Sequence, residues 1–152
     1  MKIIQVIGQW LSPRKRLLNQ LAEIAANAET LAGNLARHKE MCGYPTLRAG
    51  VAEVAAAEMG QANAMRQLLL QYGMGPKLPR MPAHEGSSNW ERLQNDLALQ
   101  VRILRSLHTQ LPQWTGIDPL LAERLREAAT QEERLIERLR DLTLKCDPQA
   151  LD

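Results

Sequence analysis

The chain has 152 residues, of which 45% are hydrophobic, and this length suits one domain with a substantial core. Alanine and leucine dominate, phenylalanine is absent and only 3% of residues are aromatic, a composition that favours helices packed along long seams over a β-sandwich. The 19 basic and 17 acidic residues are spread along the chain, so no basic stripe indicates nucleic-acid binding.

Residues 1–11 form an apolar segment that is interrupted by glycine and glutamine. The segment is too short and too polar for a signal-peptide core or a membrane span. Its larger apolar side chains recur at helical spacing. They are Ile3, Val6, Ile7 and Trp10. We therefore expect a short helix that docks on the rest of the chain or on a protein partner.

The first two long helices have clear start signals. Ser12 followed by proline predicts a helix over about residues 13–39, because serine caps a helix and proline suits its first position. A tight turn precedes Pro45, which begins a second helix that continues to Tyr72. Gly73 is the expected stop.

The last two helices carry similar signals. Ser88 and Glu91 form a capping box, which predicts a third helix that ends before Pro112. Asp118 followed by Pro119 predicts a fourth helix to about residue 145. We therefore assign residues 12–146 to an all-α four-helix bundle and residues 147–152 to a C-terminal tail.

The connection over residues 73–87 contains Pro76, Pro79 and Pro82. Spaced prolines keep a chain extended, so the segment is long enough to span the bundle. A crossover would leave the second and third helices parallel, whereas a simple up-down bundle would leave them antiparallel. We expect the crossover.

Apolar residues recur at alternating intervals of three and four on each helix, which predicts one buried stripe per helix. The stripe expected on the third helix comprises Trp90, Leu93, Leu97, Gln100, Leu104, Leu107 and Leu111. Four polar residues fall on stripe positions near the middle of their helices. They are Glu58, Gln61, Gln100 and Glu132. Glu29 flanks the stripe of the first helix at the same height, so the pattern predicts one polar layer inside the bundle.

A buried carboxylate must be paired, protonated or bound to a cation, because burying its charge alone is costly. Three arrangements satisfy this condition. The amides of Gln61 and Gln100 can donate to the carboxylates, one carboxyl can share a proton with the other, or three glutamates can hold a hard cation. The sequence alone leaves these arrangements open.

The polar layer resembles the centre of the ferritin-like superfamily, the four-helix di-iron proteins that include ferritins and rubrerythrins. That family carries a glutamate on the first and third helices and Glu-x-x-His on the second and fourth. Glu29 matches the first glutamate, Glu58 and Glu132 match the glutamates of the two motifs, and Gln100 stands in the third-helix place. Glu58 follows Pro45 by thirteen residues, as Glu132 follows Pro119, and this internal repeat supports the alignment.

The departures from the family pattern concern its metal ligands. Gln61 and Leu135 stand in the two histidine places, and Gln100 replaces a carboxylate. We therefore expect a non-catalytic structural or interaction protein with a vestigial site and no cofactor. The alternative is a metal-binding protein or oxidoreductase of the same class, with iron or manganese held by Glu29, Glu58 and Glu132 and with Gln61 and Gln100 in the same layer.

Two further pairs bear on topology and location. Cys42 and Cys146 lie in no metal-binding motif, so we expect free thiols in a cytoplasmic protein. They lie at one end of the bundle only in the crossover arrangement. His38 and His108 are interpreted as ordinary histidines near helix ends.

The outer face of the first two helices is unusually small and uncharged. Its members are Ala26, Gly33, Ala36, Ala49, Ala52, Ala56, Ala57, Gly60, Asn63 and Ala64. Small residues allow close helix approach, and ferritin-like proteins commonly associate through such faces. We expect a homodimer through this face.

Overall fold

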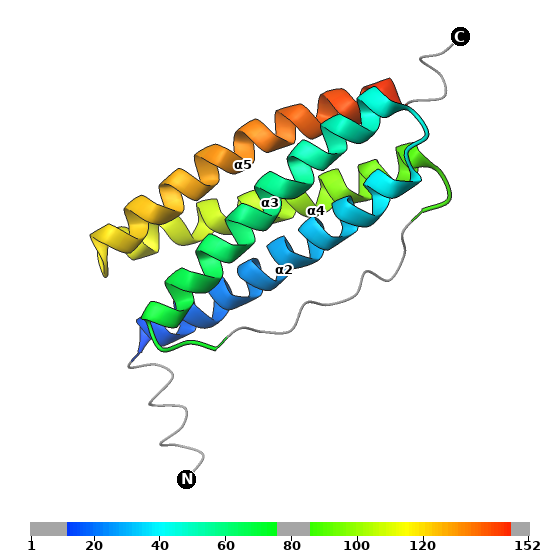
Figure 1. The fold of residues 1–152 in the computed structure, drawn as a ribbon. Helices are drawn as coiled ribbons and strands as arrows, with labels where there is room; N and C mark the ends of the chain where they lie inside the picture. The colour runs from blue at the N-terminus through cyan, green and yellow to red at the C-terminus, as the bar shows by residue number, and fades with distance from the viewer. Residues whose placement is uncertain (1–11, 76–85, 147–152) are drawn as a thin grey trace.

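The computed structural model describes residues 12–75 and 86–146, which fold into an all-α four-helix bundle. The helices are α2 (Pro13–Met41), α3 (Pro45–Gln71), α4 (Asn89–Thr115) and α5 (Pro119–Lys145) (Figure 1). The N-terminal segment 1–11, most of the predicted crossover and the tail 147–152 lie outside the described residues.

The helix starts agree with the predicted caps. The side chains of Ser12, Ser88 and Asp118 each accept a hydrogen bond from the backbone amide three residues later, at 3.3, 3.1 and 3.2 Å. Each cap satisfies one of the amides that a helix start leaves without a partner. Beyond α3, Gly73 adopts a φ of 76°, the left-handed conformation that favours glycine at a helix stop.

The predicted end of the third helix was wrong, because α4 passes through Pro112 and ends at Thr115. Proline cannot donate to the carbonyl four residues earlier, which normally disfavours it inside a helix. Here the additional turn buries Trp114 completely, and the Trp114 indole donates to Gln110 Oε1 at 3.0 Å. Gln110 Nε2 in turn donates to the carbonyl of Leu17 at 2.9 Å. Burial of the indole therefore offsets the missing hydrogen bond.

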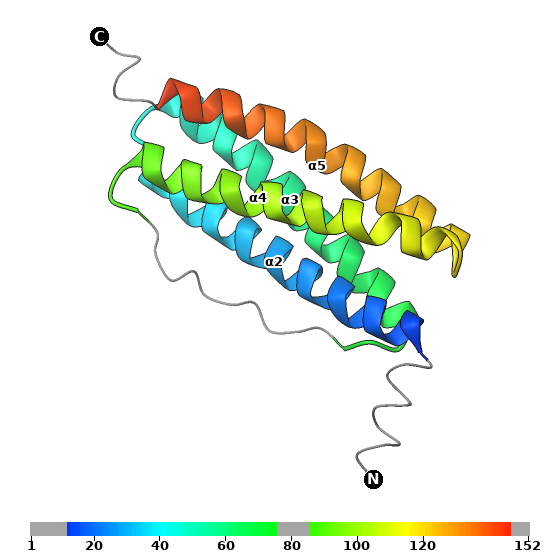
Figure 2. The ribbon, with the colours of Figure 1, turned by 180° about the vertical axis from the view of Figure 1, so that it is seen from behind.

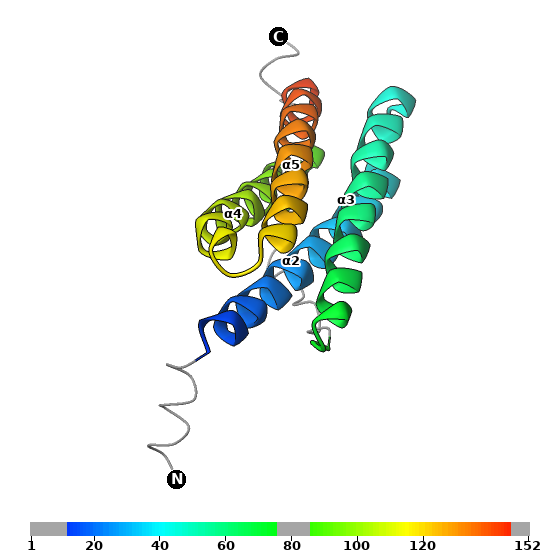
Figure 3. The ribbon, with the colours of Figure 1, turned by 90° about the vertical axis from the view of Figure 1, so that its left-hand side faces the viewer.

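The helices are arranged as two antiparallel hairpins, α2–α3 and α4–α5, that pack side by side. Figures 1 and 2 show α2 and α5 running in one direction and α3 and α4 in the other. Helix α2 also contacts α4, and α3 contacts α5. Figure 3 looks toward the end at which α2 and α5 begin. Because α3 and α4 are parallel, the chain has the direction expected for a crossover rather than for an up-down bundle.

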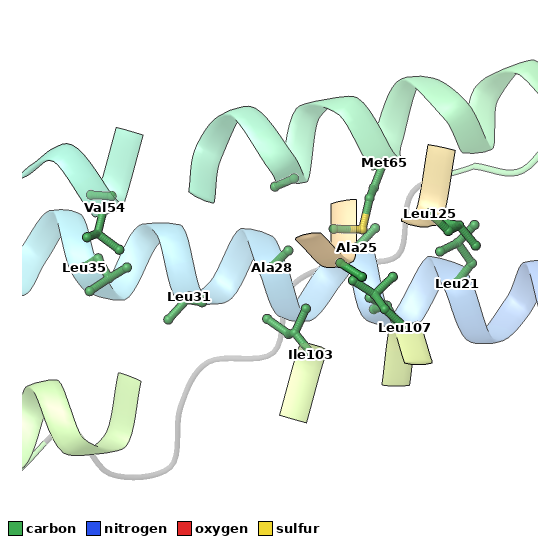
Figure 4. Packing of buried hydrophobic residues seen from close by; sticks show 14 of the residues in the cluster. Leu21, Ala25, Ala28, Leu31, Leu35, Val54, Met65, Ile103, Leu107 and Leu125 are labelled. Atoms are coloured by element: carbon green, nitrogen blue, oxygen red, sulfur yellow. The ribbon is translucent and has the colours of Figure 1, made fainter. Parts of the chain in front are cut away.

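The core is a continuous apolar cluster along the bundle axis, part of which is drawn in Figure 4. On the first helix, eight residues that recur at alternating intervals of three and four are all buried. They are Leu17, Leu21, Ile24, Ala28, Leu31, Leu35, His38 and Cys42. In Figure 4 the α2 stripe lies against Val54 and Met65 of α3 and against Ile103 and Leu107 of α4. Within the described residues, no helix combines the length and apolar character needed to cross a bilayer.

The buried stripe of α4 differs from the prediction. Its buried residues are Leu93, Asp96, Gln100, Ile103, Leu107, Gln110 and Trp114. The expected Leu97, Leu104 and Leu111 are only partly buried and lie beside the core. After Leu93, Gln100 and Leu107 the buried stripe advances by three residues, where the leucine pattern suggested four. Helix α4 therefore turns two further polar residues, Asp96 and Gln110, into the core.

Candidate functional site

A polar layer lies in the middle of the bundle, where three helices each contribute one polar side chain with no solvent exposure. These are Glu58 of α3, Gln100 of α4 and Glu132 of α5. Gln61, one turn after Glu58, is half-buried at the edge of the layer. The structure thus brings together four of the five polar residues singled out in the sequence.

Two amides donate into the layer. Gln100 Nε2 donates to Glu58 Oε1 at 2.6 Å. Gln61 Nε2 donates to the backbone carbonyl of Ala128 at 2.9 Å and lies 3.5 Å from Glu132 Oε1. Each glutamate therefore receives an amide from a neighbouring helix, as in the first arrangement considered for the sequence.

The two carboxyl groups also interact with each other. Burial, followed by the adjacent charge of Glu132, raises the pKa of Glu58 to about 9. Burial also raises the pKa of Glu132, while hydrogen bonds from Glu58, Gln61 and Gln100 lower it. At neutral pH the Glu58 carboxyl is therefore protonated and donates to the Glu132 carboxylate, so the pair shares one proton.

This proton accounts for two oxygen atoms that otherwise lack a donor. Glu58 Oε2 and Glu132 Oε2 are fully buried, and no N–H group of the described residues reaches them. A proton between the carboxyls supplies the missing hydrogen bond. Gln100 Oε1 remains buried with no donor in the described part of the chain.

Glu29 does not join the layer. It forms an ion pair with Arg66 of α3, and its side chain is 28% exposed. Both residues line a shallow recess at the α2–α3 seam together with Ala26 and Ala62. The first-helix glutamate of the ferritin-like pattern is therefore paired with a cation of the chain itself.

The residues of the layer do not fit a di-iron pair. The layer offers two carboxyls that share a proton, and Leu135, which stands in a histidine place, is apolar and buried. Di-iron centres of this class use imidazole and more carboxylates to balance the charge of two cations. Across residues 12–75 and 86–146, no three histidine, cysteine, aspartate or glutamate side chains are grouped so that they could hold a metal ion.

A second buried polar contact lies nearer the end of the bundle and was not predicted. His38 Nδ1 lies 2.5 Å from Asp96 Oδ2, and the side chains are 2% and 1% exposed. Burial raises the pKa of Asp96, and the hydrogen bond with His38 opposes that rise. The alternation of three and four residues from Leu93 through Asp96 to Gln100 is the signal that would have revealed it.

His108 and the two cysteines lie outside both buried polar contacts. His108 is exposed on α4 and lies 3.4 Å from Glu133 of α5. It is near the C-terminal end of α4, whereas His38 is near the C-terminal end of the antiparallel α2, so the two histidines lie toward opposite ends of the bundle. Cys42 and Cys146 are free thiols at the C-terminal ends of α2 and α5, which lie at the same end of the bundle. Burial raises the pKa of both thiols, and the proximity of Cys42 raises that of Cys146 further.

In comparisons with known proteins, no family model and no curated protein matches the chain.

Proposed function

We propose that this protein is a non-catalytic structural or interaction protein of ferritin-like type, in which a metal-free hydrogen-bonded layer replaces the di-iron centre. The observation that carries this proposal is the geometry of the layer, in which Glu58 and Glu132 are fully buried and receive amides from Gln100 and Gln61. A carboxyl that keeps its proton at neutral pH carries no charge to attract a cation. The ion pair of Glu29 with Arg66 supports the same interpretation, because it removes a third carboxylate.

Metal analysis combined with a double variant tests this proposal. We expect the purified full-length chain to contain iron, manganese, zinc and calcium well below stoichiometric amounts. The Glu58→Gln/Glu132→Gln variant should unfold at the same denaturant concentration as the wild type or a higher one, because amides preserve the shape and hydrogen bonds of the layer. Stoichiometric metal that is lost on Glu58→Ala and Glu132→Ala would overturn the proposal.

A second candidate function, binding of one hard cation such as Mn²⁺ or Fe²⁺, is favoured by a specific observation. Glu58 Oε2, Gln100 Oε1 and Glu132 Oε2 come from three helices and have no donor among the described residues other than a shared proton. Oxygen atoms of this kind are the ligands that hard cations prefer. A cation would have to displace the proton of Glu58.

The proton gives this second candidate a characteristic signature. Binding of Mn²⁺ should release a proton, because the metal and the proton compete for one site. Its affinity should therefore rise about tenfold for each unit by which the pH increases, up to the pKa of Glu58. Calorimetry in buffers of different ionisation enthalpy measures the released proton. Glu29→Gln is the matched control and should leave binding unchanged, since Glu29 lies outside the layer.

We further propose that two copies associate through the small-residue face of α2 and α3. In a single chain Ala49, Ala56, Gly60 and Ala64 are exposed, and this surface carries little charge. Ala26, which the sequence placed on the same face, is instead buried at the α2–α3 seam. Sedimentation of the wild type should give the mass of a dimer, and Ala56→Arg should give a monomer with unchanged helicity.

Deletion of residues 1–11 tests whether that segment mediates binding to a protein partner instead. We infer a cytoplasmic location from the two free thiols.

A further inference from the structure

The contact between α3 and α5 is the least extensive of the four neighbouring helix pairs, and it leaves a cavity of about 190 Å³ that is open to the surface on one side. Residues of α3 one turn apart line one wall, and residues of α5 line the other. The apolar lining consists of Met65 and Leu68 from α3 and Leu125 from α5. An apolar cavity of about 150 Å³ binds benzene in another protein, so this space suits a single ring or a short branched chain.

Two alanines account for the space. Ala64 of α3 and Ala128 of α5 line the cavity, where larger side chains would fill it. The inner end is marked by Gln61, which also lines the cavity and whose amide is held by the carbonyl of Ala128. The cavity therefore extends from the surface to the edge of the polar layer.

The cavity also carries one charge of each sign. Arg124 and Glu127 line it from successive turns of α5. Both side chains are exposed, and neither forms an ion pair or hydrogen bond within the described part of the chain. A ligand with a single charge would satisfy one of these groups and face the like charge of the other. A ligand with both charges pairs with each of them.

We propose that this cavity binds a small zwitterion with an apolar body, that is, a free α-amino acid with an aliphatic or aromatic side chain. Its carboxylate pairs with Arg124, its ammonium group pairs with Glu127, and its side chain contacts Met65, Leu68 and Leu125. This site does not depend on whether the polar layer holds a metal.

Titration of the ¹⁵N-labelled full chain with four matched probes tests the proposal. L-leucine carries both charges, 4-methylpentanoate carries only the carboxylate, 3-methylbutylamine carries only the ammonium group, and 4-methylpentanol carries neither. We expect leucine to shift the amide resonances of Leu125 and Ala128 and to bind more tightly than each of the others, by about two- to fivefold per exposed charge pair. If no probe shifts these resonances up to about 20 mM, the site is refuted.

Matched variants separate the cavity from its charges. Ala64→Leu fills the cavity and should abolish binding, whereas Ala56→Leu makes the same change on the same exposed face of α3, away from the cavity, and should leave binding intact. Because both alanines belong to the proposed dimer face, an effect transmitted through association would appear in both variants. Arg124→Gln/Glu127→Gln should remove the preference for leucine over the alcohol. Retention of that preference in the double variant would overturn the assignment to a zwitterion.

Discussion

His38 and Asp96 form a direct contact of 2.5 Å inside the bundle, although 58 residues separate them and their helices belong to different hairpins. The remaining ring nitrogen, His38 Nε2, is buried and has no hydrogen-bond partner among the described residues. The contact therefore joins α2 to α4 at a place where neither group can reach water.

Removing one member of this pair should destabilise the fold more than removing both. We expect Asp96→Ala to lower the free energy of unfolding by about 3–5 kcal/mol, because it leaves a buried imidazole without its partner. His38→Leu/Asp96→Leu should recover most of this loss. Urea denaturation monitored by circular dichroism measures both variants, with the exposed His108→Ala as a control. Equal losses in the single and double variants would contradict the interpretation.

The proton shared by Glu58 and Glu132 predicts how stability depends on pH. The pKa of Glu58 is about 9 in the folded chain and near its ordinary value of 4.5 in the unfolded chain. Between these two values the folded state keeps a proton that the unfolded state has lost, so stability falls as pH rises through this window. The slope from this one group is at most about 1.4 kcal/mol per pH unit.

A single substitution isolates this effect. Glu58→Gln cannot ionise, yet its amide can still donate to Glu132, so we expect a higher denaturation midpoint at pH 8 and a flatter stability profile between pH 5 and 9. Thermal unfolding across this range measures both. Glu29→Gln should keep the wild-type slope. A profile of Glu58→Gln that matches the wild type would refute the proton assignment.

The two thiols provide a chemical test of the helix order. Cys42 and Cys146 lie at the same end of the bundle and close enough for the pKa of one to respond to the other. We expect a short bifunctional thiol reagent to link them within one folded chain, with loss of both free thiols by mass spectrometry. Cys146→Ser should give only single-ended labelling. Failure to link in the wild type under conditions that label both thiols would contradict the parallel arrangement of α3 and α4.

Two glycines of α3 should respond differently to alanine. A Cβ atom at Gly60 meets nothing within 4 Å, whereas a Cβ atom at Gly50 would lie 2.5 Å from Leu142 Cδ2. Gly60→Ala should stabilise the folded chain by about 1 kcal/mol through helix propensity, measured by denaturant unfolding. Gly50→Ala should lose that gain to the displacement of a buried leucine. A larger gain at Gly50 would show that α3 and α5 are less tightly packed there.

The helix starts could be predicted from local signals. Ser12, Ser88 and Asp118 cap their helices as expected, because a cap depends on a few neighbouring residues. The end of α4 could not be predicted in this way. Pro112 is unfavourable locally, and the compensating burial of Trp114 depends on contacts with another helix.

The polar layer could be predicted in part. Glu58, Gln100 and Glu132 break otherwise apolar stripes, which marks them as buried polar groups. Glu29 lies at a suitable height, but height does not define direction, and its side chain turns toward Arg66. Asp96 was missed because the leucines of α4 suggested a neighbouring stripe.

Helix α4 contributes a polar side chain to three separate buried contacts. Asp96 contacts His38, Gln100 donates to Glu58, and Gln110 donates to the carbonyl of Leu17. Apolar stripes repeat along a helix, so a slide of one heptad would still bury leucines. These three directional contacts are spaced at unequal intervals and fit only one alignment of α4 against its neighbours. Insertion of one residue between Gln100 and Gln110 would therefore misalign the bundle far more than any exchange among its leucines.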